Sequence, residues 1–399
     1  MESVMSRQIL VLDCYRHTLS VVRSLSTAGC EVTLGVTAGD LDRGFVHVSR
    51  HVTNSWLHPD IVDGAEDFDA ALLDFLTLNP RVTLIFPVGE NSIRRLACIR
   101  ERLPSDVHLV MPRNSAIEVC LDKPSAYQLA RNCEIPVPGT RVAGSAREMR
   151  DAVKDLGFPS IVKSTDSRSL VLGRKCIFVR DELHLENLAA SWPERQADVV
   201  VQNQVSGLRH NCDFVARGGE ILLYCESEIL STDRIDYSGI SVFDRSIPPN
   251  RKHLEYCRRL VAELNYTGLG LIQFLRDTET GISYFLEANP RSAATIALAI
   301  HCGVDLPAAA VAVFVGDFSA PDASYTLNRS QHWFHGDLLG LHWERENGDV
   351  SLMQSATWLL SAFSHFMRAD CHRTFRWRDP MPTIKLYRGL LSRAFSGSR

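Results

Sequence analysis

Long apolar runs are absent from this chain of 399 residues, and no uncharged hydrophobic segment approaches the ~18 residues that span a bilayer. The amino-terminal residues also lack the apolar core and small-residue cleavage site of a secretion signal. Basic charge is not in excess, because 43 Lys and Arg stand against 47 Asp and Glu. Nucleic acid therefore has no general electrostatic attraction to the chain. These absences predict a cytoplasmic protein with no stable membrane insertion and no nucleic-acid partner.

Paired cysteine motifs are missing as well. The 11 cysteines are scattered singly without CxxC spacing, and their odd number leaves at least one thiol unpaired. Cys98, Cys120, Cys257 and Cys302 fall within apolar helical patterns. We predict reduced, buried thiols, and a catalytic cysteine is the disfavoured alternative.

A dinucleotide fingerprint is also missing, because the first apolar run, at 8–13, leads into Cys-Tyr-Arg instead of GxGxxG. That run nevertheless opens an alternating pattern. Strands are expected at 8–13, 30–36, 82–88 and 107–111, with helices at 18–28, 67–78 and 91–100. Such alternation predicts a doubly wound parallel sheet over residues 1–112.

The pattern changes after residue 112. One connecting helix is expected at 113–134, before the breakers Pro136 and Pro138. Residues 135–198 read as a small α+β unit, and 199–320 as longer strands joined by polar turns. Residues 321–399 have a looser composition and are expected to form a smaller helical appendage.

The strongest constellation lies at 268–291, where two apolar strands flank a turn at 277–281. In an antiparallel pair, Gln273 and Glu287 can face the same side, and Asn289 follows two residues later. One carboxylate and two amide oxygens suit Mg²⁺, or Mn²⁺, shared with ATP phosphates. Arg291 then offers a planar fork to a phosphoryl or carboxylate oxygen. The alternative is a plain hairpin in which Glu287 and Arg291 form a solvated pair.

Residues 285–291, Phe-Leu-Glu-Ala-Asn-Pro-Arg, resemble the metal-binding signature of ATP-grasp ligases. The preceding Ile-Gln-Phe at 272–274 is most similar to the ATP-binding half of carbamoyl phosphate synthetase large subunits, where glutamine replaces a metal glutamate. The resemblance implies the ATP-grasp fold, with a lid at 135–198 and a core at 199–320. It covers 119–315 well, the first domain loosely, and the C-terminal appendage hardly at all.

Two lysines are implied to bind the nucleotide phosphates. Lys123 matches the family lysine that reaches them from outside the lid, and without the resemblance it is an ordinary surface lysine. Lys163 ends the segment 157–163, which resembles the lid strand whose last residue meets the α- and β-phosphates. Its alternative is an edge residue with a solvated head.

The segment 199–207 resembles the hinge between lid and core, whose backbone reads adenine in the family. Gln202 lies in this strand, and Gln204 and Val205 match the adenine-reading positions. His210 stands near a nucleotide-contacting histidine of some members, although a loop histidine is usually a surface residue.

Two departures from the family pattern stand out. The lid loop at 164–175 contains a single glycine, with Ser167 and Arg168 where glycines are frequent, so its grip on the phosphates is unassigned. The hinge carries Asn203 where an acidic residue is common, which leaves ribose recognition unassigned.

The sequence indicates the substrate-binding residues less clearly than the metal and nucleotide residues. The polar stretch at 231–239 includes Arg234, which is expected either to pair with a second carboxylate or to lie in a solvated loop. Glu90 follows the carboxyl end of a parallel strand, where doubly wound sheets bind ligands, and is expected to face an amine.

The resemblance implies an ATP-dependent carboxylate–amine ligase that forms an acyl phosphate, an amide bond, ADP and phosphate. Arg291 and Lys163 are the implied catalytic residues. Its partners would be small carboxylate and amine substrates, and a homodimer is compatible with the family. The alternatives are a carbamate- or bicarbonate-phosphorylating enzyme and a non-catalytic ATP-binding protein.

The tail has a charge opposite to that of the whole chain. From 365 to 399 it carries eight Lys and Arg against two Asp and Glu, interleaved with Phe375 and Trp377. Such a segment can lie on an anionic membrane surface. We expect instead that it packs onto an acidic face of its own core.

Overall fold

The structure is a computed structural model that describes residues 7–166, 169–193, 196–319 and 324–396. The amino-terminal third contains a five-stranded parallel sheet in the order β3-β2-β1-β4-β5. Its strands are β1 (Gln8–Leu12), β2 (Glu31–Val36), β3 (Asn54–Leu57), β4 (Val82–Pro87) and β5 (His108–Leu109). The associated helices are α1 (Thr18–Thr27), α2 (Ala38–Arg43), η1 (Val46–Val48), α3 (Ala65–Leu78), α4 (Glu90–Ile99) and η2 (Arg100–Arg102).

Burial on both faces explains why β1 is an unbroken apolar run. Ile9 and Val11 pack into one hydrophobic cluster, whereas Leu10 and Leu12 pack into another. A strand covered by helices on both sides needs apolar side chains at every position. The predicted doubly wound parallel sheet is therefore confirmed.

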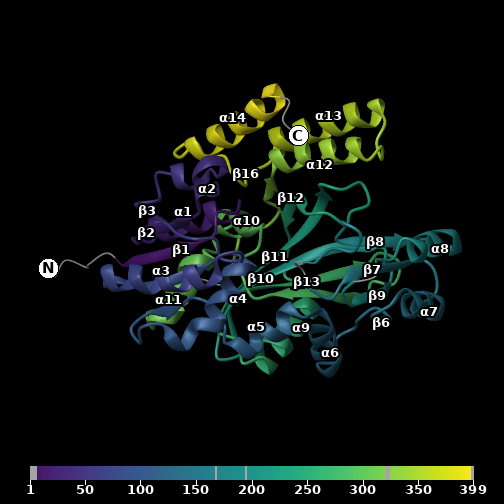
Figure 1. Ribbon diagram of the computed structural model, residues 1–399, viewed down its shortest axis with the longest axis horizontal. Helices are drawn as coiled ribbons and strands as arrows, with labels where there is room; N and C mark the ends of the chain where they lie inside the picture. The colour runs from purple at the N-terminus through teal and green to yellow at the C-terminus, as the bar shows by residue number, and fades with distance from the viewer. Residues whose placement is uncertain (1–6, 167–168, 194–195, 320–323, 397–399) are drawn as a thin grey trace.

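A second sheet, here called the lid sheet, has the order β6-β9-β7-β8 and is antiparallel. It comprises β6 (Thr140–Ala143), β7 (Ser160–Ser164), β8 (Cys176–Val179) and β9 (Val199–Asn203). Helices α7 (Ala146–Leu156) and α8 (Glu182–Ala190) share a hydrophobic cluster with it. This unit lies at the right of Figure 1, away from the parallel sheet.

The third sheet, here called the core sheet, has seven strands in the order β14-β13-β10-β11-β12-β15-β16. They are β10 (Gly207–Arg217), β11 (Glu220–Thr232), β12 (Ser241–Ser246), β13 (Gly268–Asp277), β14 (Ser283–Asn289), β15 (Ser330–His332) and β16 (Cys371–His372). One face packs against α5 (Asn114–Leu121), α6 (Lys123–Asn132) and α9 (Arg251–Glu263). The other face shares a cluster with α1, α10 (Ile296–His301) and α11 (Leu306–Val315).

The prediction of a single connecting helix at 113–134 is wrong, because the structure has two helices there, α5 and α6. Asp122 lies between α5 and α6 with extended backbone, and its side chain accepts a hydrogen bond from Ser125 N at 2.9 Å. Pro124 follows within the first turn of α6, a position where proline needs no N–H donor. The chain therefore turns at Asp122, and Lys123 begins a helix instead of lying within one.

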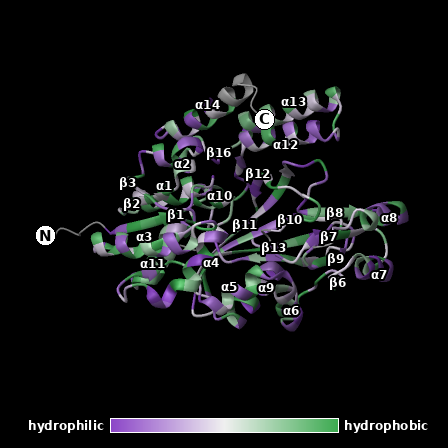
Figure 2. Ribbon diagram, in the orientation of Figure 1, coloured by the Kyte–Doolittle hydropathy of each residue, from purple (hydrophilic) through white to green (hydrophobic). Residues whose placement is uncertain are grey.

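The carboxyl-terminal segment is more closely integrated than an appendage. It supplies β15 and β16 to the core sheet, and the helices α12 (Phe334–Glu346), α13 (Leu352–Arg368) and α14 (Met381–Ser396). Figure 1 shows these helices above the core sheet, with α14 near α2. Figure 2 shows both colours along the helices, as expected for elements with one buried face.

The tail contacts the amino-terminal region of the chain. Asp379, just before α14, pairs with buried Arg23 at 2.9 Å, and Lys385 Nζ donates to Leu41 O at 2.9 Å. No helix in the described part of the chain combines the length and apolarity that crossing a bilayer requires. All 11 cysteines are free thiols.

Candidate active site

The β13–β14 hairpin brings the predicted oxygen donors together. Gln273 lies opposite Glu287, and Leu271 lies opposite Asn289. Asn289 Nδ2 donates to Glu287 Oε1 at 2.8 Å, and Gln273 Nε2 donates to Asn211 Oδ1 on β10 at 2.5 Å. One patch of the core sheet therefore holds the carboxylate and both amides.

Strand alternation explains why these side chains face the site. Their neighbours Ile272, Phe274, Phe285 and Ala288 turn to the other face and join the cluster with α9. Side chains alternate along a strand, and the register shift between Gln273 and Phe274 adds one residue to β14, so Glu287 emerges on the opposite face from Phe285.

The donor set fits Mg²⁺. Both amide groups point their N–H toward protein oxygens, which leaves Gln273 Oε1 and Asn289 Oδ1 as acceptors. Within the described residues, neither of these oxygens nor Glu287 Oε2 receives a hydrogen bond. Three hard oxygen atoms are thus free for a cation that takes its remaining ligands from phosphate and water.

The two lysines come from different elements, Lys163 from the lid sheet and Lys123 from α6, which packs against the core sheet. Lys163 on β7 donates from Nζ to Gln202 Oε1 at 3.0 Å and lies 5.3 Å from the centre of the Tyr127 ring. Gln202 is fixed in turn by Thr140, whose Oγ1 accepts from Nε2 at 2.9 Å. Lys123, at the start of α6, donates from Nζ to Ser164 O at 2.9 Å.

Electrostatics link these lysines to the core sheet. Burial lowers the pKa of Lys123, Lys163 lowers it further, and the charges of Glu287, Asp166 and Glu90 oppose the change. Two ammonium groups that destabilise one another favour an anion between them. Lys123 therefore lies between a cation of the lid sheet, Lys163, and a carboxylate of the core sheet, Glu287.

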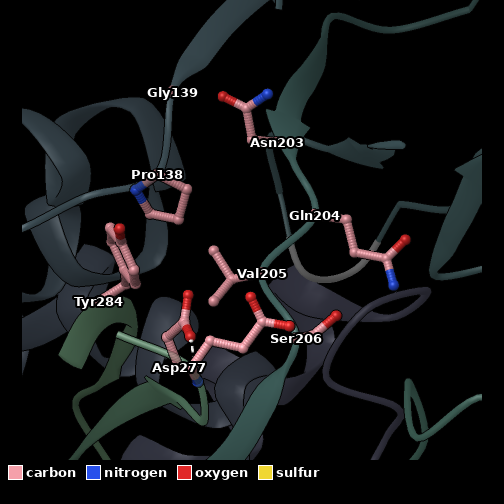
Figure 3. A pocket seen from close by; sticks show the side chains of 9 residues that line it. Pro138, Gly139, Asn203, Gln204, Val205, Ser206, Asp277 and Tyr284 are labelled. Atoms are coloured by element: carbon pink, nitrogen blue, oxygen red, sulfur yellow. Dashed lines mark hydrogen bonds between the residues drawn. The ribbon is translucent and has the colours of Figure 1, made fainter. Parts of the chain in front are cut away.

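A pocket of about 320 Å³ lies beside the hinge. Figure 3 shows Pro138 and Tyr284 on one side of it, and Gln204 and Val205 on the other. Gln204 N donates to Pro159 O at 3.1 Å. The lining includes neither lysine and not Glu287, so the pocket adjoins the hinge but not the proposed phosphate end.

Two hinge features have a structural explanation. Asn203 turns toward the lid, where its Nδ2 donates to Leu156 O at 2.8 Å, so its side chain secures the hinge to α7. In the lid loop, Ser167 and Arg168 lie outside the described residues, and Gly173 has the positive φ of 76° that favours glycine.

His210 does not lie where the nucleotide is expected. Its side chain is buried on the α9 face of β10, where Nδ1 is 3.1 Å from Glu226 Oε1 and the ring stacks edge-on against His253. Alternation turns His210 to the opposite face of β10 from Asn211, so the structure gives no support to the predicted contact between His210 and ATP.

Arg209 is the residue that the sequence argument missed. As the neighbour of His210, it emerges on the Asn211 face and donates from Nη2 to Gly239 O at 2.8 Å. Burial lowers its pKa, and the charge of Glu287 acts in the opposite direction. The structure begins β10 at Gly207, so Arg209 belongs to the strand.

The parallel sheet contributes Glu90 and its support. Glu90 begins α4 and pairs with Arg94 at 2.8 Å, and Arg94 also reaches Asp166 at 3.5 Å. Asp13 follows β1 with a φ of 78° and accepts from Gly89 N at 2.6 Å. Asp13, also missed in the sequence, therefore fixes the loop that carries Glu90.

Arg291 and Arg234 lie on different segments, after β14 and after β11. Arg291 donates to Ser292 O at 3.2 Å and lies close enough to Tyr15 to oppose the rise that burial causes in its pKa. Arg234 lies 3.9 Å over the Trp343 ring of α12, and its loop is held by Glu344, which accepts from Ile235 N at 3.0 Å.

Comparison with known proteins places this geometry in context. A family model described as ATP-grasp in the biosynthetic pathway with Ter operon matches residues 234–332. The carbamoyl phosphate synthase large chain of Methanoculleus marisnigri is 27% identical over 265 residues, covering 63% of this chain and 23% of that protein. The large chain of a Thermus thermophilus strain is 29% identical over 217 residues, covering 51% of this chain and 20% of that protein. The matched part spans less than a quarter of either relative.

Solved structures share the architecture. Biotin carboxylase from Campylobacter jejuni has a TM-score of 0.65 at 18% identity, covering 81% of this chain and 74% of that chain. The biotin carboxylase domain of the Hydrogenobacter thermophilus 2-oxoglutarate carboxylase, in complex with MgADP and bicarbonate, has a TM-score of 0.64 at 16% identity, covering 82% and 74%. The N5-carboxyaminoimidazole ribonucleotide synthetase of Thermus thermophilus has a TM-score of 0.62 at 16% identity, covering 81% of each chain.

Proposed function

The chain has the ATP-grasp fold and is related in sequence to carbamoyl phosphate synthase large chains, and from this premise we propose that it is an ATP-dependent carboxylate–amine ligase. It would phosphorylate a carboxylate with Mg-ATP and transfer the acyl group to an amine, releasing ADP and phosphate. Mn²⁺ would be an acceptable substitute for Mg²⁺.

One observation carries the proposal: Glu287, one of three oxygen donors on the core sheet, lies within electrostatic reach of Lys123, and Lys163 of the lid sheet lies within reach of the same lysine. Glu287 opposes the loss of charge at Lys123, although the two residues come from different parts of the fold. A hairpin without a ligand site has no need for a half-buried lysine near its carboxylate.

The protein groups would act mainly by position and charge. Lys163, held by Gln202, and Lys123 would bind the nucleotide phosphates, and Arg291 would hold the carboxylate and the transferred phosphoryl. Gln273, Glu287 and Asn289 would hold Mg²⁺, which when bound supplies charge neutralisation. The hinge backbone at Gln204 and Val205 would read adenine. Closure of the lid would exclude water from the acyl phosphate.

The amine, once its ammonium group has lost a proton to solvent, would attack the acyl carbon; the bond from that carbon to the phosphate oxygen would break, and the departing phosphate would take up the second proton of the nitrogen. Glu90 lies at the carboxyl edge of the parallel sheet, and we assign it the ammonium group of the incoming amine. Glu90 would then contact two cations, Arg94 and the amine substrate. This is possible because Arg94 also contacts Asp166 and does not depend on Glu90 alone for a negative partner.

The test is a matrix of amino acids and small carboxylic acids, scored for phosphate release with magnesium and ATP. ADP formation that needs both an added carboxylate and an added amine would support the ligase. ATP binding with no turnover in any combination would identify a non-catalytic nucleotide-binding protein.

A second candidate is the phosphorylation of bicarbonate or carbamate. It is favoured by the fold shared with a carboxylase domain whose structure holds MgADP and bicarbonate. ATP turnover that depends on bicarbonate alone would support this second candidate function.

A further inference from the structure

Three arginines gather around one buried histidine where the parallel sheet, the core sheet and the carboxyl-terminal segment meet. Arg16 and His17 follow β1, whereas Arg291 follows β14 and Arg373 follows β16. Burial, and then the charges of all three guanidinium groups, hold the pKa of His17 well below its usual value. Three positive charges therefore lie near the neutral imidazole of His17.

Arg373 is compensated within the protein. It is fully buried, and it donates to Asp244 Oδ2 and to Ser241 O, each at 2.8 Å. This ion pair fixes β16 to β12 and gives Arg373 a structural part.

Arg16 has no such compensation. Its guanidinium lies 4.5 Å over the Trp333 ring, and its Nε is buried without a hydrogen-bond partner. Among the residues that the structure describes, no carboxylate forms an ion pair with Arg16. Asp233 is near enough to raise its pKa, but Asp233 Oδ1 already accepts from Ile240 N at 2.6 Å. Burial and Arg373 prevail and lower the pKa of Arg16 to about 9, which leaves it a cation at neutral pH.

An uncompensated, largely buried guanidinium is unfavourable unless an anion joins it. Arg16 lies past the carboxyl end of β1, the edge at which doubly wound sheets bind ligands. Arg291, nearby, has only the Ser292 carbonyl as a partner within the described chain. Two guanidinium groups thus lie close together, each able to grip one oxyanion by two parallel hydrogen bonds.

We propose that the carboxylate substrate carries a second anionic group, which Arg16 binds beside Trp333 while Arg291 holds the carboxylate that is activated. This inference rests on the proposed function and names its substrate class: a small molecule with two oxyanions. The second oxyanion is a carboxylate or a phosphate ester. Trp333 belongs to the segment between β15 and α12, so the carboxyl-terminal segment completes the substrate site.

The experiment is calorimetric titration of the full-length protein with magnesium and a non-hydrolysable ATP analogue present. Succinate and 3-phosphoglycerate serve as two-anion probes, and butyrate serves as the single-anion probe. We expect at least one two-anion probe to bind more tightly than butyrate. Arg16→Gln should weaken that binding about tenfold or more, because it removes a charged hydrogen-bonding group, and should leave butyrate unchanged. Arg16→Lys should restore part of the affinity, since it keeps the charge but loses the fork.

The matched control is Arg7→Gln. Arg7 precedes the amino end of the same strand, pairs with Asp317 at 2.5 Å and is half exposed, so its loss should not affect any probe. Thermal unfolding of Arg16→Gln should match or exceed the wild type, because an unpaired charge is removed.

The comparison of probes decides the matter. Equal binding of butyrate and both two-anion probes, unchanged binding in Arg16→Gln, or no binding of either two-anion probe would each overturn the proposal. The ATP analogue alone, titrated first, tests the nucleotide site separately. Two-anion binding without turnover would overturn the ligase and leave this site standing.

Discussion

Glu287→Gln changes the charge of the candidate site and little else. The glutamine keeps an oxygen at the position of Oε1, so it can still accept from Asn289 Nδ2, a contact of 2.8 Å. The pairing that sets Glu287 opposite Gln273 belongs to the backbone and does not depend on the side chain. We therefore expect the free energy of unfolding to change by no more than ~0.5 kcal/mol.

The loss should fall on turnover instead. Glu287 is the only carboxylate of its set, and it also supports the charge of Lys123. Removing one fixed group aimed at charge in the transition state costs about 3–4 kcal/mol, which corresponds to a fall in kcat of about 10²–10³. The pKa of Lys123 should fall further, so the alkaline limb of ATP binding should move to lower pH.

The assay is phosphate release at saturating substrates, measured at ordinary and raised magnesium, with unfolding measured in parallel. Exposed Glu263, at the end of α9, provides the control, because Glu263→Gln removes the same charge away from the site. A folded Glu287→Gln protein that turns over almost normally at ordinary magnesium would refute the assignment.

The part of the site that could be predicted lies on long, regular elements. β13 and β14 have 10 and 7 residues, so alternation indicates which side chains of β13 share a face with Gln273 and that Glu287 and Asn289 share one on β14, whereas the register shift that separates Phe285 from them has no such local signal. The apolar run of β1 likewise reveals a strand buried on both faces. These patterns are local, and a sequence displays them directly.

What escaped prediction depends on lengths and long-range pairing. β10 is 11 residues long and includes His210, which the sequence suggested to be a loop residue, so the face that His210 occupies could not be predicted. β15 and β16 have 3 and 2 residues, too few for a periodic pattern, and they pair with each other across 38 intervening residues that include α12 and α13. Trp333 directly follows β15, so its contact with Arg16 depends on this long-range pairing. No local sequence pattern could predict that contact.

Two further predictions concern buried polar groups. Lys163→Ala should weaken ATP binding by about tenfold or more, which is the usual contribution of a charged hydrogen bond. Binding of the carboxylate substrate should weaken less, because Lys163 lies beside Gln202 on the lid sheet. Equal losses of affinity for both ligands, measured by titration of each, would show that Lys163 has a structural part instead. The last prediction concerns Glu226, which is fully buried and accepts from His253 at 2.7 Å and His210 at 3.1 Å. Burial alone would raise the pKa of Glu226, but the two histidines outweigh it and bring the pKa to about 2, from an ordinary value of 4.5. Because the folded-state pKa is depressed, the carboxylate contributes stability above pH 4.5 that is lost as the pH falls toward 2. The shift corresponds to about 3 kcal/mol. Glu226→Gln should therefore lower stability by about that amount at neutral pH, and the difference from wild type in urea unfolding should shrink through this acid window. A difference that stays constant on acidification would mean that Glu226 is not ionised against its histidines.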